Sequence, residues 1–401
     1  MKAVLVCLFC SAAIAAAKDP AEIEWQPLLK NPNSFQGFRQ LGGKAYYEVQ
    51  DGVVTGTSVL KEPNSFMATE KEYGDFVLEY EFKVDDQLNS GVQIRSHSRP
   101  DNHNGRVHGY QIEIDPSARA WSGGLYDEGR RGWLDDLKDN PKAGAAFKHG
   151  DWNKVRVEAI GDSIKTWIND VAAADLRDAM DQTGFIALQV HGVGSDAKKV
   201  GTQVQWRNLR IKDLGRHDWQ PLFDGKTLTG WKATPGGEWK VENGVIHGTS
   251  PAGDPRHGIL LSEKPLGDFT TRFQFKVNKG NSGFYFRCQP VDDPVTVHGF
   301  QAELCENNDT GGLYETGGRG WVAQTDKTRV DKEKVYKAGL WNDMWVSAHG
   351  NRLVVHVNGK KTANFVDTQQ TRSQGNFGLQ LHGSQEMDVE FRNLAVLAPA
   401  D

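Results

Sequence analysis

Short stretches in which apolar and polar residues alternate recur along almost the whole chain. Residues 91–95 and 110–115 alternate with a period of two, and residues 76–82 are rich in aromatic and branched side chains. Both patterns are typical of β-strands. The strand-like segments are closed by Gly, Asn and Asp turns, and the sequence has no long helical period. The pattern therefore predicts an all-β fold built as a sandwich or jelly roll.

Two hairpins stand out within this pattern. Residues 155–160 and 164–168 flank the turn Gly161-Asp162, and residues 346–357 repeat the arrangement around a second Gly-containing turn. One departure from the strand pattern is expected, a short helix over residues 175–181.

The chain carries the same sequence motifs twice, in the same order. The matching segments are residues 25–28 and 219–222, 74–76 and 267–269, 89–91 and 281–283, 108–111 and 298–301, 123–126 and 311–314, 188–192 and 379–383, and 207–209 and 392–394. Solenoid repeats are only about 20–50 residues long, so each copy here is a whole domain. We expect two tandem domains, residues 22–214 and 217–398, joined by a compact charged linker over residues 212–218.

The net charge and the N-terminal residues indicate which partners and which cell compartment to expect. The formal net charge is −5, and the Lys and Arg residues are scattered, so nothing suggests a nucleic-acid partner or an acidic membrane surface. Residues 1–17 combine Lys2 with an apolar run and end in three alanines, which predicts a cleaved signal peptide too short to span a bilayer. We therefore expect an exported bacterial protein, secreted or periplasmic, without a membrane span.

Two of the four cysteines lie within residues 1–17, which leaves Cys288 and Cys305. If residues 284–288 and 298–306 form an antiparallel hairpin, Cys288 lies near the turn and Cys305 far from it. A disulfide needs Cα atoms about 4.4–6.8 Å apart, so we expect no bridge.

The period of two also groups polar side chains on strand faces. Gln111, Glu113 and Asp115 share one face of their strand, as do Gln93 with Arg95 and Gln189 with His191. If these strands are neighbours, each domain has one polar patch on a sheet face, made of Arg95, Gln111, Glu113, Gln189 and His191 in the first copy and Arg287, Gln301, Glu303, Gln380 and His382 in the second.

A Gly-rich loop in each copy carries further candidates, Tyr126, Arg131 and Trp133 in the first and Tyr314, Arg319 and Trp321 in the second. Amides and carboxylates beside aromatic planes suit a sugar, which offers hydroxyls at its rim and apolar C–H groups on its faces. The alternative for any single Arg–Glu pair is a structural ion pair across the sheet.

The motifs together resemble a known family. The runs Asn-Ser-Gly-x-x-x-Arg, Gly-Tyr-Gln-x-Glu, Gly-Gly-Leu-Tyr, Trp-Asn, Leu-Gln-x-His-Gly and Arg-Asn-Leu resemble the 3-keto-disaccharide hydrolase domain, also described as 3-keto-glucoside 1,2-lyase/3-keto-2-hydroxy-glucal hydratase. The resemblance covers nearly all of the chain after the signal peptide, twice. It implies two tandem concanavalin A-like jelly-roll β-sandwiches, each with its site on a concave sheet.

The chain departs from the family pattern at two places. Family members often read Gly-Tyr-Glu-x-Gln, whereas here the order of amide and acid is reversed at Gln111 and Glu113. Members also often have Asp before the His, where this chain has Val190 and Leu381.

The resemblance implies cleavage of an oligosaccharide or glycoside already oxidised at C3, by elimination and then hydration. It assigns His191 and His382 as bases, because an imidazole with a pKa near 6.5 suits proton removal at neutral pH. Arg95 or Arg131 (Arg287 or Arg319) would stabilise the enolate, and Tyr126 or Tyr314 would protonate the leaving oxygen. The acids Glu113 and Glu303 complete the catalytic set, and Glu113 with His191 are the two candidate ligands for a divalent metal. The expected substrate-binding residues are Gln111, Gln189, Trp133, Gln301, Gln380 and Trp321.

Two other functions stay open at this point. The run from Glu113 to Asp115 resembles the start of a family 16 glycoside hydrolase signature, but Ser117 and Ala118 follow where a second catalytic Glu belongs, and Cys305 replaces the Asp in the second copy. A carbohydrate-binding sandwich without catalytic activity is the alternative from a different class.

Overall fold

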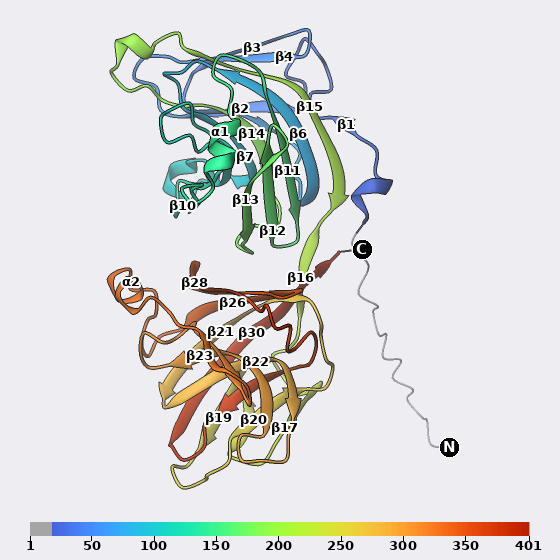
Figure 1. The fold of residues 1–401 in the computed structure, drawn as a ribbon, viewed down its shortest axis with the longest axis vertical. Helices are drawn as coiled ribbons and strands as arrows, with labels where there is room; N and C mark the ends of the chain where they lie inside the picture. Colours follow the sequence, from blue (N-terminus) through green and yellow to red (C-terminus); the bar gives the residue numbers. More distant parts are fainter. Residues whose placement is uncertain (1–17, 401) are drawn as a thin grey trace. The chain divides into compact units, whose positions relative to one another are not determined.

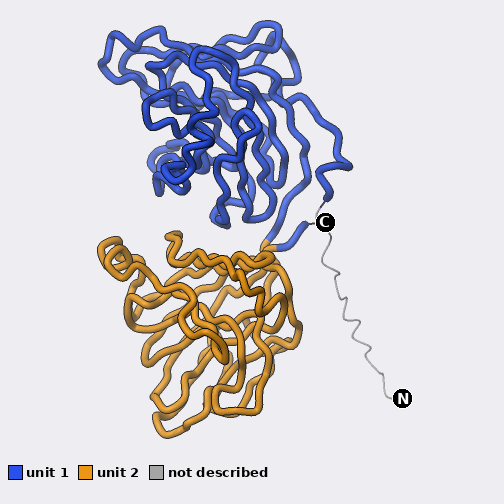
Figure 2. The backbone as a smooth tube through the Cα atoms, in the orientation of Figure 1, with its two compact units in different colours: residues 1–218, 398–401 blue, residues 219–397 orange. Residues whose placement is uncertain are grey.

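The computed structural model describes residues 18–400. The chain divides into two compact units, residues 1–218 with 398–401 and residues 219–397 (Figure 2). Strands dominate both units, so the predicted all-β fold of two tandem sandwiches is confirmed. The expected signal peptide lies outside the described residues. Within residues 18–400, no helix is both long and apolar enough to cross a membrane.

The first unit contains two antiparallel sheets (Figure 1). We call one of them the site sheet; its strands, in spatial order, are β10 (Gly132–Asp135), β9 (Leu125–Glu128), β8 (His108–Ile114), β7 (Ser90–His97), β14 (Phe185–Val190), β5 (Ser65–Thr69) and β2 (Phe38–Gly42). The opposite sheet has the order β13 (Val171–Arg177), β12 (Ser163–Ile168), β11 (Asn153–Ile160), β6 (Asp75–Val84), β15 (Gln203–Gly215), β4 (Val53–Thr57) and β3 (Tyr46–Gln50), with β1 (Gln26–Pro27) paired to β15.

The second unit repeats this architecture. Its site sheet has the order β17 (Trp231–Ala233), β20 (Gly258–Ser262), β29 (Asn376–Leu381), β22 (Asn281–Pro290), β23 (Val297–Cys305), β24 (Leu313–Thr316) and β25 (Gly320–Ala323). The opposite sheet has the order β18 (Glu238–Glu242), β19 (Val245–Ser250), β30 (Met387–Pro399), β21 (Phe269–Lys279), β26 (Asn342–His349), β27 (Arg352–Val357) and β28 (Lys360–Val366), with β16 (His217–Pro221) paired to β30. Both predicted hairpins are present, as β11–β12 and β26–β27.

The described residues include a few short helices, η1 (Pro20–Glu22), η2 (His103–Gly105), α1 (Pro141–Ala146), η3 (Ala197–Lys199) and α2 (Lys327–Lys332). The helix expected over residues 175–181 is wrong. Residues 171–177 form β13, because Ala174 and Leu176 alternate into the core at a period of two. The expected linker is also structured, since Lys212 continues β15 and pairs with Val77 of β6.

The core of the first unit lies between its two sheets. Val92 and Ile112 of the site sheet and Leu78 and Trp206 of the opposite sheet belong to one buried apolar cluster. Because side chains alternate along a strand, the residues next to Val92 and Ile112 in sequence point to the outer face of the site sheet. The core packing therefore selects which residues are available for a site.

Cys288 and Cys305 are buried and unbridged, as expected. In the pairing of β22 with β23, Cys305 lies opposite Asn281 at one end and Pro290 lies opposite Val297 at the other. Cys288 is close to that second end, so the two thiols are separated along the hairpin.

Arg95 does not share a face with Gln93, so the predicted placement is wrong. The pairing of β7 with β8 shifts register after Ile94, and Arg95 adopts a left-handed backbone with φ of 44°. This bulge turns the side chain inward, where its guanidinium donates to the carbonyl oxygens of Gly74 at 2.8 Å and Gly161 at 2.7 Å and pairs with Asp75 at 3.1 Å. These partners belong to the opposite sheet and its β11–β12 turn, so Arg95 ties the two sheets together.

Arg287 repeats this tie in the second unit, and the correction applies to it as well. Its φ is 46°, and it donates to the carbonyl oxygens of Gly267 and Gly350 and pairs with Asp268 at 3.0 Å. One difference separates the copies: the side chain of Asp75 is 5% exposed, whereas that of Asp268 is 58% exposed.

We expect Arg95→Met to destabilise the first unit by roughly 3–5 kcal/mol, because it removes the guanidinium that faces the buried Asp75 carboxylate and takes the side-chain donor away from the carbonyl groups of Gly74 and Gly161. The Gly161 N–H and His217 remain as partners of Asp75. Arg287→Met is expected to destabilise the second unit less, since water reaches Asp268. Hydrogen exchange read on peptides from each unit measures both effects separately. Arg99→Met, at an exposed position four residues further along, is the control. Equal, small effects of Arg95→Met and Arg99→Met would contradict the tie.

Candidate functional site

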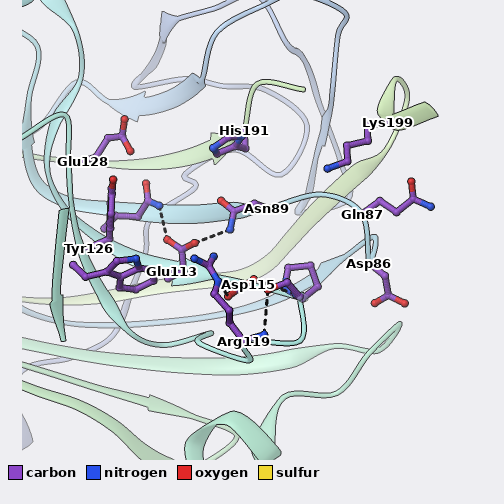
Figure 3. Close-up of a pocket in the computed structure, with 14 residues that line it drawn as sticks. Asp86, Gln87, Asn89, Glu113, Asp115, Arg119, Tyr126, Glu128, His191 and Lys199 are labelled. Carbon is purple, nitrogen blue, oxygen red and sulfur yellow. Dashed lines mark hydrogen bonds and ion pairs between the residues drawn. The ribbon is translucent and has the colours of Figure 1, made fainter. Parts of the chain in front are cut away.

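A hollow of 640 Å³, which we call the first hollow, opens on the outer face of the site sheet in the first unit (Figure 3). The strands β8 and β9 supply its centre, and the loops after β6, β8 and β14 supply its rim. Its lining residues are mostly polar or aromatic: Asp86, Gln87, Asn89, Gln111, Glu113, Asp115, Pro116, Ser117, Arg119, Tyr126, Glu128, Trp133, His191 and Lys199.

Glu113 is the buried carboxylate of this hollow, with 5% of the residue exposed. Asn89 donates to its Oε1 at 2.6 Å, and Gln111 donates to its Oε2 at 2.8 Å; Figure 3 draws the bond from Asn89. Burial disfavours the charged form, and the two amide donors favour it. Burial is the larger effect, so the pKa of Glu113 is raised to about 7. The side chain therefore exchanges a proton readily at neutral pH.

A chain of amides behind Glu113 sets the direction of these hydrogen bonds. Gln93 and Gln189 both donate to Oε1 of Gln111, at 2.6 Å and 2.9 Å. Gln111 is left with its NH₂ group to donate to Glu113. Gly91 makes room for this arrangement, because a Cβ at that position would lie 2.5 Å from Cδ of Gln111.

His191 follows the last residue of β14 and presents one nitrogen to the hollow. Its Nδ1 lies 2.8 Å from the carbonyl oxygen of Gly192. A carbonyl oxygen only accepts, so in the neutral ring Nδ1 carries the hydrogen and Nε2 has the lone pair. Asn64 accepts from the backbone N–H of Gly192 at 2.9 Å and holds this turn in place. The neutral imidazole is therefore fixed in the tautomer that acts as a base through Nε2.

Aromatic and cationic groups form the side of the hollow nearest β10. The Arg119 guanidinium pairs with Asp115 at 3.0 Å and lies over the ring of Trp133 at 5.5 Å. Tyr126 packs edge-on against the same indole at 5.2 Å, and burial raises its pKa, so its hydroxyl stays protonated. Trp133 provides an apolar plane of the kind that sugars pack against.

The structure brings together five of the first-copy candidates, Gln111, Glu113, Tyr126, Trp133 and His191. Gln189 lies beneath them and acts through Gln111. Arg131 does not join the set: it contacts Asp127, pairs with Asp178 at 2.8 Å and lies over the core residue Tyr110. With Arg95 also turned inward, neither predicted arginine lines the hollow.

Sequence reasoning missed several lining residues. Asn89 had a signal, because its Asn-Ser-Gly motif recurs at Asn281, but it precedes the alternating run of residues 91–95 and so has no predicted strand face. Arg119 has no counterpart in the repeat, since the loop between β8 and β9 has a different length in the two copies. Glu128 of β9 and Lys199 of η3 also line the hollow, and their places in it depend on the packing of segments that are far apart in the sequence.

The second unit retains the carboxylate. Glu303 accepts from Asn281 at 2.5 Å and from Gln301 at 2.9 Å, and burial again raises its pKa to about 7. Tyr314 and Trp321 pack edge-on at 5.5 Å, as their first-copy counterparts do. The predicted Arg319 pairs instead with Glu315 and Asp367. Its guanidinium is therefore held by acidic side chains, as that of Arg131 is in the first unit.

Three positions around the carboxylate of Glu303 carry a different residue from the matching positions around Glu113. Cys305 stands where the first copy has Asp115, and Tyr285 stands where it has Gln93. Gln380 donates to the hydroxyl of Tyr285 at 3.2 Å and to Nδ1 of His257 at 2.9 Å. The His257 ring packs 4.3 Å from that of His382, centroid to centroid. His382 therefore packs against a neighbouring ring, whereas His191 in the first unit faces the hollow.

The residues present do not fit a divalent metal. Glu113 and His191 line the same hollow, but both carboxylate oxygens of Glu113 face amide N–H donors, which would also point at a bound cation. Across residues 18–400, no group of three or more His, Cys, Asp or Glu side chains is arranged to hold a metal ion. We derive no chemical step through a metal.

We expect Asn89→Ala to raise the pKa of Glu113 above about 7, because it removes a hydrogen bond that favours the ionised carboxylate. Titration of the carboxyl ¹³C signal measures the midpoint. Asn281→Ala is the matched change and should raise the pKa of Glu303 while leaving that of Glu113 unaltered. A midpoint that falls, or does not move, in Asn89→Ala would show that Asn89 does not control the charge of Glu113.

Solved structures with a similar fold each match about one unit of the chain. A carbohydrate-binding module, CBM66 from Bacillus subtilis, is 19% identical with a TM-score of 0.32, covering 41% of this chain and 93% of its own. A Bacillus subtilis protein with a galectin-like fold is 12% identical with a TM-score of 0.36, covering 43% of this chain and 92% of its own. No curated protein is significantly similar to the chain.

One family model matches the sequence twice, over residues 24–212 and 218–397. The model is that of the 3-keto-alpha-glucoside-1,2-lyase-like domain, and the two matches together cover most of the chain. They agree with the tandem repeat read from the sequence and with the two sandwiches of the fold. The chain therefore belongs to this carbohydrate-active family, as a tandem pair of its domains.

Proposed function

We propose that this protein cleaves glycosides that carry a ketone at C3, by elimination followed by addition of water. The observation that carries the proposal is the pairing, in one hollow, of a carboxyl group with a pKa of about 7 and an imidazole whose Nε2 is free. Membership of the lyase-like family supports the same chemistry. The proposed substrate is a sugar bound against Trp133.

In the first step, a C3 ketone makes the C2 proton acidic. Nε2 of His191 takes that proton, the C2–H electron pair forms a C1–C2 double bond, and the bond from C1 to the leaving oxygen breaks. The neutral carboxyl of Glu113 gives its proton to the leaving oxygen. The released alcohol and a 2-hydroxy-glucal with a C3 ketone are the products of this step.

In the second step, water adds across the C1–C2 double bond. The oxygen of the water bonds to C1 while the Glu113 carboxylate takes a proton from the same water. The His191 imidazolium returns a proton to C2. Both side chains regain their starting forms, and the net reaction is hydrolysis. The cycle therefore needs only these two side chains, each of which passes on one proton and later regains one.

Arg119 is the cation best placed to stabilise the enolate oxygens, in place of the inward-facing Arg95 and Arg131. It lines the hollow, and its contacts with Asp115 and Trp133 fix its position before substrate binds. Such preorganised charge stabilises a developing oxyanion without reorganisation. The protonated hydroxyl of Tyr126 donates to sugar oxygens at the same side.

We assign most of the activity to the first unit. The second unit has Cys305 in place of the acid that positions Arg119, and His257 packs against His382. Its carboxylate Glu303 is retained with the same raised pKa, so residual activity there is part of the proposal.

Cleavage of a 3-keto-glucoside in heavy water should place deuterium at C2 of the product, because elimination moves the C2 proton to the His191 imidazolium, which exchanges it with the solvent before a proton is returned to C2. His191→Ala should reduce the rate by about 10²–10⁴-fold, as loss of a general base typically does. His382→Ala is the matched control and should do less damage. Mass spectrometry of the product, corrected for exchange of the free ketone, measures the label.

The label separates the proposed reaction from its alternatives. Product without deuterium at C2 would indicate ordinary hydrolysis by a pair of carboxyl groups, for which Glu128 lies in the same hollow. Sugar binding without cleavage would indicate a carbohydrate-binding protein. An unimpaired double variant of His191 and His382 would assign the base to another residue.

The pH profile tests the role of Glu113. Its raised pKa keeps the carboxyl neutral up to about pH 7, so the proton donor is present below that pH and is lost above it. We expect kcat/KM to fall about tenfold per pH unit above about 7, and Glu113→Gln to lose activity at every pH. Glu303→Gln is the control and should keep the profile. A rate that rises from pH 7 to 9 would make Glu113 the base.

A further inference from the structure

The ammonium group of Lys199 lines the first hollow and takes no part in the proposed chemistry. Lys199 is the last residue of η3. In Figure 3 its side chain extends toward the middle of the hollow, and Glu113 and His191 lie between it and Tyr126. A positive charge therefore stands at the end of the hollow opposite its aromatic side.

The loop that carries Lys199 is longer in the first copy than in the second. Residues 191–202 connect β14 to β15, whereas residues 382–386 connect the matching strands β29 and β30. The additional length contains η3, and residues 382–386 include neither lysine nor arginine. The second unit forms the same sandwich with the shorter loop, so the fold itself does not require Lys199.

Hydrogen bonds hold this longer loop against the segment that follows β4. The Ser58 hydroxyl donates to the Lys199 carbonyl oxygen at 2.6 Å, and the Ser58 N–H donates to the Thr202 carbonyl oxygen at 3.0 Å. At the other end of the loop, the Lys61 N–H donates to the Gly194 carbonyl oxygen at 2.7 Å. The backbone at Lys199 is therefore in place before a ligand binds, and only the side chain has to adjust.

The acids that line the hollow already have hydrogen-bond or ion-pair partners. Besides Glu113 with its two amides, the pairs are Asp115 with Arg119 at 3.0 Å, Glu128 with Arg106 at 3.3 Å, and Asp86 with His149 at 2.7 Å. Across the described part of the chain, residues 18–400, the Lys199 ammonium has no ion-pair or hydrogen-bond partner. A cation without a counter-charge at the edge of a hollow attracts anionic ligands to it.

We propose that Lys199 binds an oxyanion on the leaving group of the glycoside, a carboxylate or a phosphate. The oxidised ring packs against Trp133, and Glu113 protonates the leaving oxygen. The leaving group then extends past Glu113 toward the end of the hollow where Lys199 stands, and the ammonium donates a charge-assisted hydrogen bond to the oxyanion. This proposal rests on the proposed function, and it names the chemical class of the leaving group.

The test compares aryl 3-keto-glucosides whose leaving groups are similar in size and differ in charge. They are the 4-carboxyphenyl, the 4-(phosphonooxy)phenyl and the neutral 4-carbamoylphenyl compounds, each as both anomers. The readout is the ratio of kcat/KM for a charged substrate to kcat/KM for the neutral one. The intrinsic reactivity of each substrate is the same with every variant, so a change in the ratio isolates the contribution of the side chain.

We expect Lys199→Gln to lower the ratio for at least one charged substrate by about tenfold, the effect of one charged hydrogen bond. Lys199→Arg should keep most of the ratio. Lys198→Gln removes the same charge from an exposed neighbour outside the lining, and it should leave the ratio unchanged. Raising the ionic strength from about 0.01 M to about 1 M should lower the ratio in the wild-type chain, because salt screens the charge, and should affect Lys199→Gln less.

A binding measurement keeps this proposal separate from the proposed function. Calorimetry with the three unoxidised aryl glucosides needs no turnover. We expect the wild-type chain to bind a charged glucoside more tightly than the neutral one, and Lys199→Gln to remove most of the difference. The glucoside that gains most identifies the oxyanion as a carboxylate or a phosphate.

The outcomes of the two experiments are distinguishable. If no keto substrate is cleaved, the proposed chemistry is wrong, and the binding difference alone decides the role of Lys199. Equal binding of charged and neutral glucosides, or a kcat/KM ratio that Lys199→Gln leaves unaltered, would overturn the proposal. A ratio that Lys198→Gln lowers as much as Lys199→Gln does would also overturn it, because net charge alone would then explain the preference.

Discussion

A carboxylate buried on the face of a sheet has to be surrounded by hydrogen-bond donors, and this requirement organises the first domain. Glu113 receives one donor from Asn89, just before the neighbouring strand β7, and one from Gln111, two residues away on its own strand. The donors arrive only if β7, β8 and β14 are adjacent and in the observed register, and only if Gly91 leaves room for an amide. The same arrangement leaves the acid desolvated enough to hold a proton at neutral pH.

The period of two predicted the floor of the site because β8 and β14 remain regular up to it. Gln111, Glu113 and His191 were placed on one surface from alternation alone, and the structure brings all three to the same hollow. Alternation failed at Arg95 and Arg287, where a left-handed residue at a bulge reverses the side-chain direction. Nothing in the local sequence marks that reversal, because a positive φ at arginine is stabilised by carbonyl groups far away in the chain.

The sides of the site were beyond the reach of sequence analysis for a related reason. Arg119 and Glu128 come from a loop and from β9, the strand next to the edge of the sheet, and their positions depend on packing rather than on a repeating pattern. His257 approaches His382 across more than a hundred residues, and it does so through hydrogen bonds to a loop that has no similar counterpart in the first copy. The two copies therefore share the residues at the centre of the site sheet and differ in the loops around it.

The amide chain has one further consequence, which concerns where the acid can stand. Position 111 already receives two donors at Oε1, from Gln93 and Gln189, and position 113 receives one from Asn89. Exchanging Gln111 with Glu113 would keep every one of these acceptors and reverse only the single bond between the two exchanged side chains. The order that is commoner in the family is therefore compatible with the same scaffold. Evolution can move the negative charge about 7 Å along the floor of the hollow, one pleat of the strand, without rebuilding its surroundings.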